Sequence, residues 1–173
     1  MIRIFLIASL IISNFTLAEY TNSNGKALEK PFKDLIKWVR SDVEPKLAQI
    51  DVSSEWQTIN LNEADNYIIW IGHSTFLIKK KGITILTDPV FSDRASPFKN
   101  VGPERLIPPA MSIDQLPKID FVTVSHNHYD HLDINSLKEI SKLHHEAIFF
   151  VPIGDGKLLK RKRIKNVYEF NWW

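Results

Sequence analysis

The 173-residue sequence predicts an α/β domain that begins near Asn66, in which helices pack on a sheet containing parallel strands. Three short β-rich runs separated by Gly72 and Gly82 come first, as expected of consecutive antiparallel strands. Apolar strand patterns then alternate with amphipathic helical patterns, which favours parallel strands connected by helices. A dense group of histidines and aspartates follows the first of these later strands, where sites in such sheets commonly lie.

Residues 1–18, MIRIFLIASLIISNFTLA, are expected to form a cleavable export signal. Arg3 precedes an apolar run that is too short to span a bilayer, which takes about 20 apolar residues. The stretch from Thr16 to Ala18 resembles a signal-peptidase site. An uncleaved anchor and a buried N-terminal strand are the alternatives. The prediction is a mature protein that begins near Glu19 and is exported, either periplasmic or associated with a membrane.

Residues 19–66 are predicted to be a polar leader that contains one amphipathic helix. Apolar residues recur at helical spacing from Leu28 to Val39, and Pro31 falls where a first helical turn accepts it. This apolar stripe is expected to pack on the domain.

The domain proper is expected to occupy residues 67–173. Residues 92–112 contain four prolines and few periodic apolar residues, which predicts a long loop of the kind that is often functional. The predicted strands are YIIWIG, STFLIKKKG, ITILTDPVF, IDFVTVS, AIFFVP and VYEF, and the predicted helices are LDINSLKEISKLH and GDGKLLKRKRIK. The helical residues expected to face the core are Leu137, Ile140, Leu143, Leu158, Leu159 and Ile164.

Composition narrows the chemistry before any motif is considered. The charge is nearly balanced, with 22 basic and 20 acidic residues, which argues against nucleic-acid binding. The sequence has no cysteine, so that histidine, aspartate and glutamate remain as the metal ligands. The basic segment at residues 157–165 is interpreted as a solvated helix face, with contact to anionic lipid headgroups at a membrane surface as the alternative.

The segment SHNHYDHLD, residues 125–133, carries three of the six histidines of the chain and two aspartates. In an extended loop His126 and His128 project to the same side, as two imidazoles must do to share one ion. Asp130 and His131 follow where the chain bends into a helix. Imidazole and carboxylate favour zinc, and iron or manganese less, and paired ions activate water and clamp a phosphoryl oxygen. A solvated histidine-rich loop is the alternative, but the clustering favours a metal site.

The pattern H-x-H-x-D-H after an apolar strand resembles the metallo-β-lactamase fold. Four segments narrow the resemblance to the hydrolases of the N-acyl-phosphatidylethanolamine-hydrolysing phospholipase D type. They are WIGHSTFLI, ILTDPVFSDRASP, VSHNHYDHLD and FFVPIG. This resemblance implies an α+β fold, the αββα sandwich. It also implies two zinc ions in a complete domain, with His126 and His128 on the first ion and Asp130 and His131 on the second.

Three further residues take roles from the resemblance. It makes Asp130 a catalytic residue as well as a ligand, and it makes Asp88 a carboxylate that orients the ligands through hydrogen bonds. His73, in GHST, is expected to be a buried, hydrogen-bonded histidine near the site rather than a ligand.

The family's remaining ligands, which are two histidines and a bridging aspartate, lie in the second half of its fold. The 173 residues are therefore expected to correspond to the N-terminal half, and neither His144 nor His145 is expected to replace the missing ligands. The expected activity is zinc-dependent hydrolysis of a phospholipid or another phosphodiester, without turnover by the 173 residues alone. Hydrolysis of another ester or lactone, and a non-catalytic remnant, are the alternatives. The oligomeric state stays open.

Overall fold

The computed structural model of the protein describes residues 52–98, 100 and 102–171, together with the helical residues Lys33 and Lys37. The chain divides into two compact units, residues 1–49 and 50–173, and the sheet lies in the second. The predicted export signal and most of the predicted leader helix lie outside the described residues, so both remain predictions. No helix in the described part of the chain is long and apolar enough to cross a membrane.

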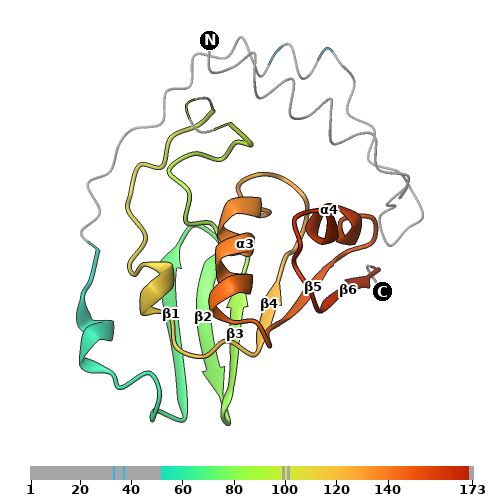
Figure 1. Cartoon of the computed structure of the whole chain (residues 1–173). Coiled ribbons are helices and arrows are strands. Elements are labelled where there is room, and N and C mark those ends of the chain that lie inside the picture. The colour runs from blue at the N-terminus through green and yellow to red at the C-terminus, as the bar shows by residue number, and fades with distance from the viewer. Residues whose placement is uncertain (1–32, 34–36, 38–51, 99, 101, 172–173) are drawn as a thin grey trace. The chain divides into compact units, whose positions relative to one another are not determined.

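A single sheet of six strands, in the order β1-β2-β3-β4-β5-β6, forms the centre of the second unit (Figure 1). Strands β1 to β3 pair antiparallel, whereas β3 to β6 pair parallel. This confirms the mixed sheet expected from the sequence. The strands are β1 (Asn66–Gly72), β2 (Thr75–Lys80), β3 (Ile83–Thr87), β4 (Phe121–Thr123), β5 (Ile148–Pro152) and β6 (Val167–Phe170).

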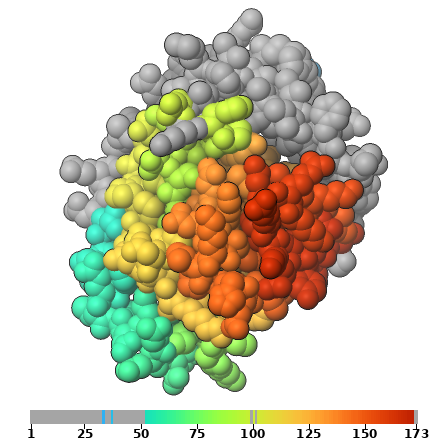
Figure 2. Space-filling view, in the orientation of Figure 1, coloured from blue at the N-terminus to red at the C-terminus, as the bar shows by residue number. Residues whose placement is uncertain are grey.

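The connections between the parallel strands carry the helices, as parallel pairing requires. The connection from β3 to β4 is the predicted long loop and contains the 3₁₀ helix η2 (Ile113–Gln115). Helix α3 (Ile134–Leu143) joins β4 to β5, and α4 (Gly156–Arg161) joins β5 to β6. A short 3₁₀ helix, η1 (Glu55–Thr58), precedes the sheet. Figure 1 shows α3 and α4 on the same face of the sheet, and Figure 2 shows their orange and red side chains as a continuous surface there.

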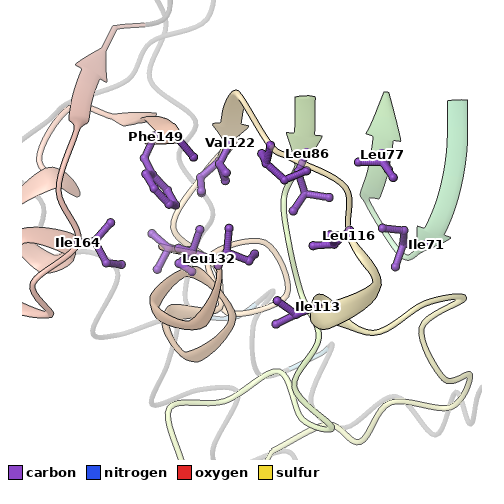
Figure 3. Packing of buried hydrophobic residues seen from close by; sticks show 14 of the residues in the cluster. Ile71, Leu77, Leu86, Ile113, Leu116, Val122, Leu132, Phe149 and Ile164 are labelled. Carbon is purple, nitrogen blue, oxygen red and sulfur yellow. The ribbon is translucent and has the colours of Figure 1, made fainter. Parts of the chain in front are cut away.

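The hydrophobic core fills the space between this face of the sheet and the helices (Figure 3). Alternate residues of β1 to β5 point inward, as the two-residue period of a strand dictates, and leucines and isoleucines of the helices meet them. The fully buried side chains include Leu77, Leu86, Val122, Leu132, Leu137, Ile140, Phe149 and Leu159.

The prediction that Leu143 and Leu158 face the core is wrong. Leu143 is 53% exposed and Leu158 is 39% exposed. Leu158 precedes the buried Leu159, and neighbouring helical residues point about 100° apart, so the two cannot both face the core. Leu143 is the last residue of α3, and two steps of three residues rotate it about 120° away from Leu137.

The opposite face of the sheet presents exposed apolar side chains. Ile68 is 72% exposed, and Phe170 and Tyr168 are more than half exposed. The rings of Phe121 and Phe150 stack on this face at a centroid distance of 5.5 Å. The charged side chains of residues 157, 160–163 and 165, around α4, are exposed, as expected for a solvated face.

Candidate metal centre

The loop from the end of β4 to the start of α3 carries the predicted ligands. After the buried Val124 the chain turns back on itself, because the backbone N–H groups of His131 and Leu132 both donate to the carbonyl of His128 at 2.9 and 2.7 Å. Leu132 is buried in the core, and Asp133 caps α3 by accepting from the backbone N–H groups at positions 135 and 136. The loop is therefore fixed at both of its ends.

This turn brings the four predicted metal ligands together. The imidazole centroid of His126 lies 4.7 Å from that of His128 and 4.0 Å from that of His131. The ligand atoms of His126, His128 and Asp130 all lie within 4.8 Å of one another. Asp130 also belongs to a second such group with His131 and His73. Its carboxylate therefore stands between two sets of imidazoles.

The expectation that His73 is buried is wrong. Its side chain is 48% exposed, and its Nε2 lies 3.3 Å from Oδ2 of Asp130. His73 occupies the turn between β1 and β2, where a side chain has few neighbours from its own hairpin.

Asp88 lies directly after β3 and contacts the ligand loop, in the position expected of an orienting carboxylate. Its Oδ2 lies 2.8 Å from Nδ1 of His131 and accepts the hydroxyl hydrogen of Ser125 at 2.8 Å. Its Oδ1 accepts from the backbone N–H of Ser125 at 2.6 Å. Ser125 also lies 3.0 Å from Nδ1 of His126, so the carboxylate reaches a second imidazole through this hydroxyl.

These contacts determine which ring nitrogen of His126 and of His131 is available to bind a metal ion. A carboxylate only accepts hydrogen bonds, so Nδ1 of His131 carries the proton. The hydroxyl hydrogen of Ser125 is donated to Asp88, so Nδ1 of His126 donates to the hydroxyl oxygen. In the neutral form of both rings, Nε2 is then left with a lone pair for a metal ion. Sequence reasoning missed Ser125, because a serine before a histidine has no pattern of its own.

The surroundings of His126 favour its neutral form. Burial lowers the pKa of His126, and the neighbouring His131 and His128 lower it further, against the opposite effects of Asp130 and Asp88. Neutral imidazole is the form that binds metal. A donor set of imidazoles and one carboxylate, with the Asp88 carboxylate behind it to hold two of the rings, fits a divalent transition metal.

Asn127, which lies between two ligands, ties the loop to the next connection of the sheet. Its amide donates to Oδ1 of Asp155 at 3.3 Å. Asp155 is buried at the start of α4, and burial raises the pKa of its carboxyl group. Glu169 in β6 accepts from the backbone N–H groups of Gly154 and Gly156 and holds this turn in place. The sequence indicated no role for Asn127, because the contact spans two strands.

His144 lies elsewhere in the fold, as expected. Its Nδ1 accepts from the backbone N–H of Ile119 at 3.4 Å, and Ile119 precedes β4 whereas the ligand loop follows it. His145 is exposed beside it.

Two cavities meet at His73. One has a volume of about 600 Å³ and is lined largely by apolar residues that include Trp56, Ile59 and Trp70. The other, of about 270 Å³, reaches Asp130. Arg105 lines both, with its guanidinium donating to the carbonyls of residues 90 and 92, and burial lowers its pKa.

Comparison with known proteins agrees with this geometry. The family model described as the beta-lactamase superfamily domain matches residues 67–168. The chain is 41% identical to N-acyl-phosphatidylethanolamine-hydrolyzing phospholipase D 1 of Caenorhabditis elegans over 116 residues, which cover 64% of this chain and 33% of that protein. It is 38% identical to the mitochondrial N-acyl-phosphatidylethanolamine-hydrolyzing phospholipase D of Saccharomyces cerevisiae over 107 residues, which cover 62% of this chain and 22% of that protein.

Among solved structures, the isothiocyanate hydrolase from Delia radicum gut bacteria matches with a TM-score of 0.49 and 19% identity, over 60% of this chain and 41% of that chain. The chain spans a third or less of the length of the two curated relatives. The family model covers more than half of the chain, including strands β2 to β5 and the complete ligand loop. The chain therefore belongs to the metallo-β-lactamase superfamily.

Proposed function

We propose that these residues form part of the active site of a zinc-dependent phosphodiesterase that acts on an N-acylated phospholipid. The observation that carries the proposal is the cluster of His126, His128, Asp130 and His131 at the carboxyl end of β4, with Asp88 behind it. The names of the relatives support the substrate class. Because the chain spans a third or less of those relatives, the activity is proposed for the site within a protein of their length.

In this proposal His126 and His128 hold one ion, and Asp130 and His131 contribute to the other. Bound divalent ions supply Lewis acidity at the phosphoryl oxygens and lower the pKa of water. Hydrolysis breaks the bond between phosphorus and the alcohol oxygen, and it yields an N-acylethanolamine-like alcohol and a phosphatidate-like product.

The protein's own residues keep this arrangement in place. Asp88 and Ser125 hold the proton on Nδ1 of His131 and of His126, so that Nε2 of each ring faces the site. The largely apolar cavity beside His73 suits the hydrocarbon part of a lipid, and Arg105 in its lining suits a phosphate.

A graft tests the proposal. Residues 67–171 replace the matching segment of the C. elegans relative, and the purified graft is assayed with zinc on N-acylated phosphatidylethanolamine, a chromogenic phosphodiester and a lactone. We expect phosphodiester hydrolysis that stops with chelator and falls at least about 100-fold in His128→Ala, because groups that act as a unit are lost together. The matched control, His145→Ala, removes an exposed imidazole outside the cluster and should keep full activity.

A folded graft that binds zinc and hydrolyses only the lactone would contradict the phosphodiesterase assignment. That result would instead support the alternative of another ester or lactone as the substrate.

A further inference from the structure

His73 lies in a tight turn whose backbone is unusual for its residue type. Gly72 pairs with Thr75, so His73 and Ser74 are the two residues that connect β1 to β2. The φ angle of His73 is +49°, in the left-handed region. Two-residue turns of this kind usually place asparagine or glycine there, and another side chain costs about 1–2 kcal/mol. Such conformations cluster at functional sites, where the surroundings hold them.

The surroundings here hold the backbone of the turn from both sides. The indole Nε1 of Trp70 donates to the carbonyl of His73 at 2.8 Å. The hydroxyl of Thr87 in β3 donates to the carbonyl of Ser74 at 2.8 Å. The imidazole of His73 is thereby placed at the edge of the ligand cluster, with its ring centroid 5.1 Å from that of His131.

The distances around the Asp130 carboxylate separate a direct ion pair from a shared metal ion. Oδ2 of Asp130 lies 3.3 Å from Nε2 of His73 and 3.7 Å from Nε2 of His131. Charge-assisted hydrogen bonds between nitrogen and a carboxylate are about 2.7–2.9 Å long, so both distances are too long for one. Tetrahedral zinc with bonds of about 2.0–2.2 Å holds neighbouring donor atoms about 3.3–3.6 Å apart. The His73–Asp130 distance of 3.3 Å matches such an edge, and the His131–Asp130 distance of 3.7 Å lies just above it.

The position of the proton on His131 also supports a shared metal ion. Nδ1 of His131 is occupied by Asp88, which leaves Nε2 as its free donor atom, facing the same carboxylate oxygen that His73 approaches. Three donor atoms, one from the β1–β2 turn and two from the ligand loop, therefore lie within 4.8 Å of one another, at the place where both cavities meet.

We infer that His73 is a protein ligand of the metal ion that Asp130 and His131 hold. This inference rests on the proposed metal-dependent function and changes the ligand set of the second ion. Within this chain the ion gains a third donor residue beside Asp130 and His131. The exposed face of the imidazole leaves the ion reachable from the apolar cavity.

Metal binding by the 173-residue chain, without any substrate, tests the inference. The chain is dialysed to equilibrium against Co²⁺ alone at a series of concentrations, and bound metal is measured by elemental analysis and visible absorption. Two variants, His73→Gly and His73→Asn, remove the imidazole with residues that adopt a positive φ without strain. In both we expect one of the two ions to bind at least about 10-fold more weakly, because even an indirect partner of a ligand is worth that much.

X-ray absorption of the Zn²⁺-loaded chain gives a second readout, since the mean number of imidazoles per ion should fall in both His73 variants. His145→Ala is the matched control and should bind metal as the unaltered chain does. Equal affinity and an equal imidazole count in His73→Gly would overturn the inference.

The outcome is separable from that of the proposed function. Loss of one ion in the variants together with an inactive graft would leave His73 a ligand and the phosphodiesterase proposal wrong. Unchanged metal binding in the variants together with an active graft would mean that His73 is not a ligand and that the phosphodiesterase proposal holds. A chain that binds no Co²⁺ at all overturns the inference, whereas the graft alone decides the proposed function.

Discussion

Replacing Asp88 by asparagine should weaken metal binding without unfolding the protein. The carboxylate accepts from the backbone N–H of Ser125, from the hydroxyl of Ser125 and from Nδ1 of His131. Asparagine has nearly the same shape and tolerates the positive φ of 37° at this position. It has only one oxygen, however, so its NH₂ group must face one of these donors.

If the amide oxygen keeps the backbone N–H, then the NH₂ group meets Nδ1 of His131 and the hydroxyl of Ser125. His131 then relieves the clash by moving its proton to Nε2, where the proton blocks the metal-binding lone pair. The loss of a carboxylate that orients a ligand lowers metal affinity about 10- to 100-fold, or about 1.4–2.8 kcal/mol. We expect a loss in this range for Asp88→Asn.

The assay is competition between the purified chain and a chromophoric chelator for Zn²⁺, with urea unfolding to show that the variant is folded. Asp120→Asn is the matched control. Oδ2 of Asp120 accepts from the backbone N–H of Thr84 at 2.9 Å, just before β4 begins and thus away from the ligand loop. A folded Asp88→Asn chain with unchanged Zn²⁺ affinity would refute the reasoning that this carboxylate sets the ring protonation.

Two further predictions concern stability. Asp133→Ala removes the cap of α3 and leaves the part-buried N–H group of Ser92 without its acceptor, whereas the N–H group of Phe91 keeps the hydroxyl of Ser136. The change should cost about 2–4 kcal/mol in urea unfolding, and the exposed Asp114→Ala should change little. Burial lowers the pKa of His144, so between that pKa and the ordinary value of about 6.5 the unfolded chain binds a proton that the folded chain does not. The stability that the protein has with a neutral His144 is therefore fully present above this pH range, and it is lost as the pH falls through the range. His144→Gln should show a smaller difference between unfolding midpoints at pH 7 and pH 5, and an unchanged difference would contradict this assignment.

The sequence by itself predicted the elements that short-range patterns encode. Alternating apolar residues predicted the strands, and helical spacing predicted α3 and α4 near their observed positions. The density of imidazoles and carboxylates between His126 and His131 predicted a metal site, because those residue types are the ones that bind metal and lie within one short turn. The family resemblance added Asp88.

Tertiary structure decided which distant groups meet at that turn. The contact of Asp88 with His131 spans 43 residues, and that of Asn127 with Asp155 spans 28. His73 reaches Asp130 because the β1–β2 turn lies beside the end of β4, which depends on how four strands pair and in what register. The exposure of Leu143 and Leu158 was decided in the same way, by the rotation of each helix against the sheet. Local patterns carry no information on such pairings, since the free energy that selects them comes from burying one face of the whole sheet at once.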